Sequence, residues 1–160
     1  MPRIIETTVY TIDEHPNPEY VYEWIRNNWH DLGEHVVEEF VESLNGFASH
    51  IGARCNYSIS IVPDMGEFIR FDIERSLSDV MESLDLAGNC PFTGVYSDEI
   101  ILDAFRRASK EDNLHDILRD VEYRVLKAIH GEVEFIYSDE GLYEFCLCNE
   151  HEFTESGKIA

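Results

Sequence analysis

The segment EHVVEEFVESLNGFASHI, residues 34–51, restricts the fold more than any other stretch of the chain. Its apolar residues recur every three or four positions over about four turns, as they do on one face of an α-helix. They are Val36, Val37, Phe40, Val41, Leu44, Phe47, Ala48 and Ile51. Gly52 follows, and glycine commonly ends a helix. We therefore predict an amphipathic helix whose apolar face must be covered by other parts of the chain.

Two segments with strand-like alternation follow this helix. The first is RCNYSISIV and the second is EFIRFDI, with the turn-forming residues PDMG between them. The apolar faces consist of Tyr57, Ile59 and Ile61 in the first segment and of Ile69, Phe71 and Ile73 in the second. This pattern predicts an antiparallel β-hairpin.

The remaining segments complete an α+β fold. Further helices are predicted over residues 18–29, 98–109, 112–130 and 139–148, with a short helix over residues 76–84, and further strands over residues 4–12 and 151–159. Asn17 is the expected N-cap of the first of these helices, with Pro18 at its first position. We predict a single globular domain of residues 1–160, in which a small antiparallel sheet of three to four strands packs with four to five helices.

The tetrapeptide YSDE occurs twice, at residues 96–99 and 137–140. In each copy the serine, Ser97 or Ser138, stands where a helix N-cap is needed. The acidic residues that follow it are favoured by the positive end of the helix dipole. Both copies are therefore interpreted as helix starts that carry no chemistry.

The charge of the chain excludes several kinds of partner. There are 33 acidic and 12 basic residues, giving a formal net charge of −21, and the excess runs along the whole chain. Direct binding to nucleic acid needs a basic surface, so we expect none, and anionic membranes are disfavoured for the same reason. The chain has 44% hydrophobic and 12% aromatic residues, which is too many for a disordered acidic tail.

Four glutamates form a regular row on the predicted helix of residues 34–51. Glu34, Glu38 and Glu42 are spaced four residues apart, and Glu39 widens the row. A step of four residues places charges about 6 Å apart along a helix axis. No lysine or arginine interrupts the row, so its members repel one another.

A second acidic row, Asp112, Asp116 and Asp120, has Arg119 and Arg124 near enough to neutralise part of it. Rows of this kind allow two interpretations. Most acidic helix faces only keep a protein soluble, and a halophile-type composition is a related explanation. An unpaired row can also imitate a phosphate backbone and attract a basic nucleic-acid-binding protein. On the second interpretation, Glu34, Glu38, Glu39 and Glu42 are the predicted partner-binding residues.

No catalytic or metal motif is present in the sequence. His30 and His35 are five residues apart with Gly33 between them, whereas zinc-protease helices need a spacing of four. Cys146 and Cys148 are about 200° apart around a helix and cannot hold one zinc ion together. We therefore expect no catalytic residue, no metal ligand and no cofactor.

Several strings resemble a group of small acidic proteins encoded by phages and prophages, some of which carry antitoxin-like labels. These strings are TTVYTIDE, WIRNNWHDLGEHVVE, YSISIVPDMGEFI and IYSDEGLYEFCLCNEHEFTESGK. The resemblance implies an origin in a mobile element and a location in the host cytoplasm, where the four cysteines would be reduced thiols. Met-Pro-Arg followed by IIETTVY also lacks the pattern of a secretory signal. The resemblance transfers no functional residue.

These observations predict a non-enzymatic inhibitor of a host defence or nucleic-acid-processing protein, of the anti-CRISPR or anti-restriction type, that acts by DNA mimicry. Its partner would be a basic nucleic-acid-binding host protein. One alternative is an antitoxin-like protein that neutralises a basic toxin. A second alternative is a metal-dependent enzyme that uses His30, His35 and nearby acidic residues. The sequence leaves the oligomeric state open.

Overall fold

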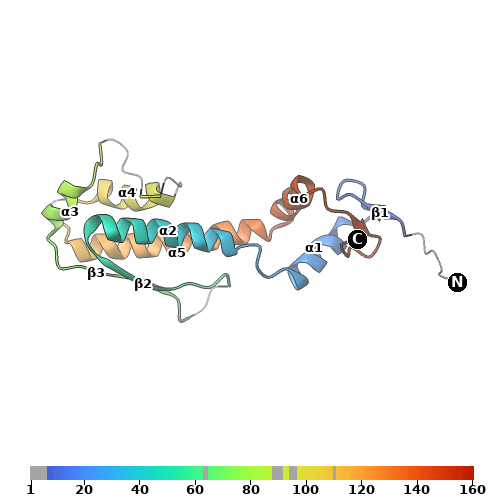
Figure 1. Ribbon diagram of the computed structural model, residues 1–160, viewed down its shortest axis with the longest axis horizontal. Helices are drawn as coiled ribbons and strands as arrows, with labels where there is room; N and C mark the ends of the chain where they lie inside the picture. The colour runs from blue at the N-terminus through green and yellow to red at the C-terminus, as the bar shows by residue number, and fades with distance from the viewer. Residues whose placement is uncertain (1–6, 63–64, 88–91, 94–96, 110) are drawn as a thin grey trace. The chain divides into compact units, whose positions relative to one another are not determined.

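The computed structural model describes residues 7–62, 65–87, 92–93, 97–109 and 111–160. Within these residues it contains six helices and four short strands, so the predicted α+β class is confirmed (Figure 1). The strands form two separate antiparallel sheets of two strands each. The prediction of one sheet of three to four strands with four to five helices was therefore wrong in these details.

The elements belong to two compact units, which are described separately. Unit 1 comprises Met1–Gly33 and Val133–Ala160, and unit 2 comprises Glu34–Glu132. The prediction of a single domain depends on how the two units are joined, and it stays a prediction. No helix in the described part of the chain is long and apolar enough to cross a membrane.

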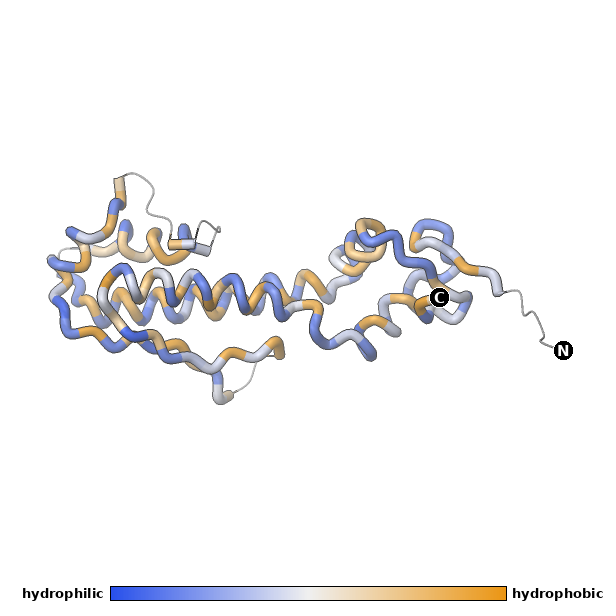
Figure 2. Tube along the Cα trace, in the orientation of Figure 1, coloured by the Kyte–Doolittle hydropathy of each residue, from blue (hydrophilic) through white to orange (hydrophobic). Residues whose placement is uncertain are grey.

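Unit 2 is built around two long helices and the predicted hairpin. Its elements are α2 (Glu34–Ile51), β2 (Arg54–Ser58), β3 (Phe68–Asp72), α3 (Leu77–Ser83), α4 (Ser97–Arg107) and most of α5 (Leu114–Ile136). Apolar residues recur along α2 and α5 among hydrophilic ones, as the amphipathic pattern requires (Figure 2). Helix α5 extends six residues beyond the predicted end at His130.

The apolar face of α2 forms the centre of the unit 2 core. Leu44, Phe47 and Ile51 are fully buried. The ring of Phe47 packs edge-on against Phe71 of β3 at 5.3 Å and against Phe105 of α4 at 5.5 Å. The bounds predicted for this helix are confirmed, and Gly52 ends it with a positive φ of 71°.

The hairpin is confirmed, but its first strand is shorter than predicted. Strands β2 and β3 pair from Arg54 opposite Asp72 to Ser58 opposite Phe68. Ile59 and Ile61 lie beyond the end of β2 and take no part in the pairing. Part of the predicted turn, residues 63–64, lies outside the described residues.

Unit 1 joins the two ends of the chain. Strand β1 (Val9–Tyr10) pairs with β4 (Phe153–Thr154), beside α1 (Pro18–Asn28) and α6 (Asp139–Cys148). The fully buried side chains of the core come from both ends of the sequence and include Val21, Ile25, Leu142 and Phe153. The predicted final strand of residues 151–159 is observed only at Phe153–Thr154. The predicted first strand is observed only at Val9–Tyr10, and residues 1–6 lie outside the described residues.

The buried side chain of His15 connects the two ends of unit 1. Its Nε2 lies 2.9 Å from the carbonyl oxygen of Thr154, and its Nδ1 accepts a hydrogen bond from the backbone N–H of Asn17 at 3.1 Å. Because Nδ1 accepts the hydrogen bond from Asn17, Nε2 is the nitrogen that donates to the Thr154 carbonyl oxygen. Asn17 occupies the predicted N-cap position, but its side chain makes no capping hydrogen bond.

The two YSDE copies both start helices, but they differ in detail. Ser138 caps α6, with its Oγ accepting from the N–H of Gly141 at 3.1 Å, as predicted. Helix α4 begins at Ser97 itself, so the prediction of Ser97 as the residue before the helix was wrong. The hydroxyl of Ser97 is buried and lies 2.5 Å from that of Ser43.

Candidate partner-binding surfaces

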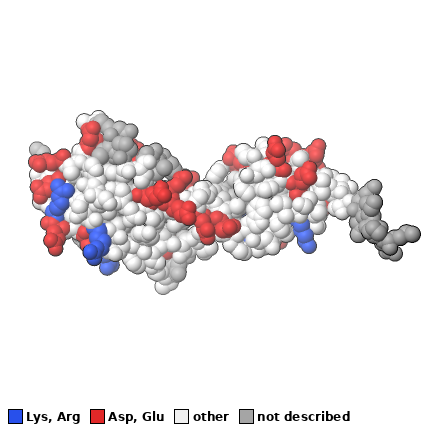
Figure 3. All heavy atoms as spheres, in the orientation of Figure 1, with Lys and Arg blue, Asp and Glu red and all other residues white. Residues whose placement is uncertain are grey.

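The predicted acidic row lies on the exposed side of α2. Glu34, Glu38, Glu39 and Glu42 are all exposed. In the described part of the chain, none of them is within 4.0 Å of a lysine, arginine or histidine nitrogen. Figure 3 shows a band of acidic atoms over the start of α2 with no basic atoms beside it. The structure thus leaves this row exposed and unneutralised.

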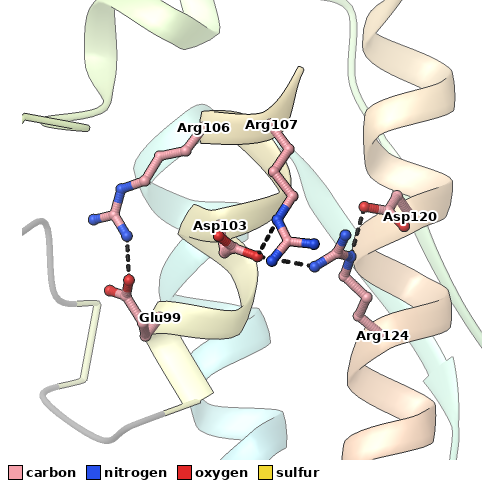
Figure 4. A network of polar contacts seen from close by, with 6 residues as sticks. All are labelled: Glu99, Asp103, Arg106, Arg107, Asp120 and Arg124. Atoms are coloured by element: carbon pink, nitrogen blue, oxygen red, sulfur yellow. Dashed lines mark hydrogen bonds and ion pairs between the residues drawn. The ribbon is translucent and has the colours of Figure 1, made fainter.

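Other acidic side chains of unit 2 are neutralised by ion pairs. Asp103 of α4 accepts from Arg107 Nε at 2.8 Å and from Arg124 Nη1 at 3.0 Å (Figure 4). The Nε of Arg124 also contacts Asp120 at 2.6 Å. Glu99 pairs with Arg106 on α4. The α2 row therefore differs from the acidic side chains around α4.

The second predicted row, Asp112, Asp116 and Asp120, takes part in interactions within the protein itself. Arg124 neutralises Asp120 as predicted, whereas Arg119 forms no ion pair with this row among the described residues. The carboxylate of Asp112 accepts from the N–H of Ser109 at 2.6 Å, before α5 begins. Asp116 belongs to the first turn of α5, where acidic residues interact favourably with the helix dipole. This row is therefore a weaker candidate than the row on α2.

A groove that sequence analysis did not predict lies between β3 and α5. Its volume is about 1560 Å³. One wall is formed by eight consecutive residues, 68–75, and a short edge by residues 52–54. The other wall is α5, on which Leu114, Leu118, Glu122 and Leu126 form a row at four-residue spacing. The groove is much larger than a typical small-molecule pocket of roughly 300–1,000 Å³.

Four arginines that line this groove lack a carboxylate partner within ion-pair distance in the described residues, and one of them, Arg75, donates instead to the carbonyl oxygens of Ile51 and Asp79. Arg54, Arg70 and Arg119 are exposed and come from β2, β3 and α5. Arg70 lies over the ring of Phe68 at 6.0 Å, at the outer limit of a cation–π contact. Acidic residues outnumber basic ones by 33 to 12, so this concentration of unpaired cations is unexpected.

One carboxylate, that of Glu122, reaches across the groove to β3. Its Oε1 accepts a hydrogen bond from the N–H of Phe71 at 3.3 Å. Burial raises the pKa of Glu122 above its usual value, and the hydrogen bond from Phe71 and the nearby His115 and Arg119 offset part of this rise. The side chain occupies the place where a neighbouring strand would bind to β3.

A buried hydroxyl cluster in unit 2 is explained by structure alone. Ser43 contacts both Ser97 and Thr93, and Thr93 donates to the Oδ1 of Asp98 at 3.3 Å. The Oδ2 of Asp98 accepts from the N–H groups of Phe92 and Thr93. Asp98 therefore holds residues 92–93 against the first turn of α4.

The histidines considered as metal ligands are both exposed. His30 belongs to unit 1 and His35 to unit 2. No cluster of three or more histidine, cysteine, aspartate or glutamate side chains suited to a metal ion occurs among the residues that the structure describes. Cys146 is buried and Cys148 is exposed, as their predicted positions on opposite sides of α6 require. Burial raises the pKa of the Cys146 thiol to about 11.

Comparisons with protein-family models, with curated proteins and with solved structures found no significant match. The resemblance to phage-encoded acidic proteins therefore stays a prediction. The sequence did not predict the arginine groove because Arg54, Arg70 and Arg119 are far apart along the chain and form no local pattern. Its only signal in the sequence is that Arg54 and Arg70 occupy polar positions of the predicted hairpin.

Proposed function

We propose that this protein is a non-enzymatic inhibitor that occupies the nucleic-acid-binding surface of a basic host protein. The target would be a defence or nucleic-acid-processing protein of the kind blocked by anti-CRISPR or anti-restriction proteins. The row of Glu34, Glu38, Glu39 and Glu42 would take the place of nucleic-acid phosphates. The setting would be the cytoplasm of a host cell in which a phage or prophage gene is expressed.

The observation that supports this proposal is the unneutralised state of the α2 row. Asp103 and Asp120 are held by arginines, whereas the α2 glutamates are exposed and have no ion-pair partner among the described residues. Clustered like charges on one helix face weaken that helix slightly. They also create a negative potential that attracts a basic partner rapidly and in a salt-dependent way.

The proposal can be tested by pull-down from a bacterial lysate with the tagged full-length protein. The bait is used as the wild type and as the triple variant Glu34→Lys, Glu38→Lys, Glu42→Lys. We expect the wild type to capture a basic nucleic-acid-binding protein at low salt. High salt or added duplex DNA should release it, because both compete with a phosphate-like surface. The triple variant should capture little or none of it.

A matched control must change the net charge by the same amount at other positions. Glu82, Glu132 and Glu144 are exposed, lie outside the row and form no salt bridge in the described structure. Their triple replacement by lysine should leave capture nearly unchanged. If both triple variants lose the target equally, overall charge rather than the α2 row is responsible. A target held in high salt and insensitive to DNA would instead favour the antitoxin-like function.

A further inference from the structure

Among the described residues, neither outer edge of the unit 2 hairpin pairs with a further strand, and the outer edge of β3 faces the groove. In the part of the chain that the structure describes, β3 pairs only with β2. The N–H of Phe71 points to Glu122 of α5 and therefore away from β2. Alternate residues of an antiparallel strand direct their backbone groups to the same side, so Ile69 also presents its N–H and C=O groups to the groove.

The residues that line the groove support this orientation. Residues 68–75 all line it without a gap. A strand face would contribute only every second residue, whereas a strand edge exposes consecutive residues. Exposed edges of this kind bind further strands unless something covers them. Here the side chain of Glu122 covers one backbone position.

The opposite wall suits an extended peptide. Leu114, Leu118 and Leu126 of α5 provide an apolar row, and Tyr123 beside it is 64% exposed. A strand of about six residues spans roughly 20 Å and places alternate side chains on opposite sides. One set of side chains would contact the apolar row of α5. The other set would lie near the arginines.

Four arginines and three carboxylates, those of Asp72, Glu74 and Glu122, line the groove, and the arginines that lack ion pairs favour an acidic occupant. Arg54, Arg70 and Arg119 come from three different segments, and in the described structure none of them forms a salt bridge. A nucleic acid would also be attracted by these cations. However, a nucleic acid cannot form strand-type hydrogen bonds with β3. An acidic peptide satisfies both the arginines and the strand edge.

We propose that the groove between β3 and α5 binds an extended acidic segment of a partner protein, which adds to the hairpin as a third strand. The carboxylate of Glu122 leaves the N–H of Phe71 when the segment binds, and the backbone of the segment replaces it. No residue of α2 lines this groove. The groove is therefore a second binding surface, and its existence does not depend on the inhibitor function proposed above.

The test uses fluorescence polarisation with the full-length protein and a labelled ten-residue peptide of alternating glutamate and valine. We expect saturable binding at low salt. Two control peptides have the same sequence, with N-methyl groups on the backbone amides of the odd-numbered residues in one and of the even-numbered residues in the other. Each control keeps the charge of the parent peptide but loses one set of strand hydrogen bonds. At least one control should bind about tenfold more weakly. If both bind as tightly as the parent peptide, charge alone attracts it and strand addition is wrong.

Protein variants give the complementary test. The double variant Arg70→Glu, Arg119→Glu should weaken peptide binding by at least about tenfold. The matched control Arg107→Glu, Lys127→Glu makes the same charge change outside the groove. It should change the affinity for the peptide by less than about twofold.

Replacement of Glu122 gives an effect of opposite sign. The variant Glu122→Ala frees the N–H of Phe71 and removes a negative charge from the groove. It should bind the peptide more tightly, by about two- to fivefold. A misfolded variant would lose affinity and could not give this result. Weaker binding by a folded Glu122→Ala protein, or tighter binding of a single-stranded oligonucleotide than of the peptide, would overturn the proposal.

Discussion

The repulsion within the α2 row can be measured by reversing its middle charge. Glu38 has an acidic neighbour four residues away on each side, Glu34 and Glu42. It lies beyond the first turn of α2, so the helix dipole contributes little to its energy. The variant Glu38→Lys converts two repulsive pairs into two attractive ones and leaves the buried face of the helix unchanged.

The expected gain in stability follows from these two pairs. A like-charge pair at this spacing costs about 0.2–0.5 kcal/mol, and an opposite-charge pair gains a similar amount. Reversing both pairs should therefore raise the free energy of unfolding by about 1–2 kcal/mol at low salt. Glu38→Gln removes the repulsion without adding attraction, so it should give about half of this gain.

Urea denaturation followed by circular dichroism is a suitable assay, because urea does not add ionic strength as guanidinium chloride does. At about 1 M NaCl the Debye length falls to about 3 Å, and most of the gain should disappear. The control Glu132→Lys makes the same charge change where residues 128, 129, 135 and 136 are apolar, and it should have a much smaller effect. If Glu38→Lys gives no gain at low salt, or the same gain at high salt, the glutamates do not repel one another as the structure implies.

Three further predictions concern other parts of the chain. At pH 8 a thiol reagent should label exposed Cys148 at least about a hundredfold faster than Cys146, whose thiol pKa burial raises to about 11, as peptide mass spectrometry can measure. The variant Gly157→Ala should lower the free energy of unfolding measured with urea by more than about 2 kcal/mol, because φ of Gly157 is 79° and a Cβ would lie 2.4 Å from the backbone of α1. The variant Gly131→Ala should raise it slightly, because a Cβ there meets nothing within 4 Å. Burial raises the pKa of Glu122 in the folded state, so just above pH 4.5 the folded protein binds more protons than the unfolded chain. The contribution of Glu122 to the free energy of unfolding therefore falls as pH rises. The variant Glu122→Gln should remove this pH dependence from denaturation curves measured between pH 4 and 8.

Local patterns were enough to predict the elements whose structure depends on neighbouring residues in the chain. The spacing of Phe40, Leu44 and Phe47 determines which face of α2 is buried, and Gly52 ends the helix where expected. The alternation around Ile69 and Phe71 likewise predicted the pairing of β2 with β3. These predictions succeeded because a helix or a hairpin has a fixed period that the sequence must follow.

The ends of elements depended on packing that local patterns do not contain. Helix α5 was predicted to end at His130, before Gly131, because glycine is a poor helix former. It continues to Ile136, and Val133 on the far side of that glycine is buried. Packing of an apolar side chain outweighs the propensity of a single glycine, which costs about 1 kcal/mol.

The acidic row and the arginine groove show the same contrast at the level of the candidate sites. The row lies within one helix, so the four-residue spacing of Glu34, Glu38 and Glu42 was sufficient to predict it. The groove combines Arg54 and Arg70 of the hairpin with Arg119 of α5. Because these residues are separated by 16 and 49 positions in a 160-residue chain, only the packing of the hairpin beside α5 brings their charges together.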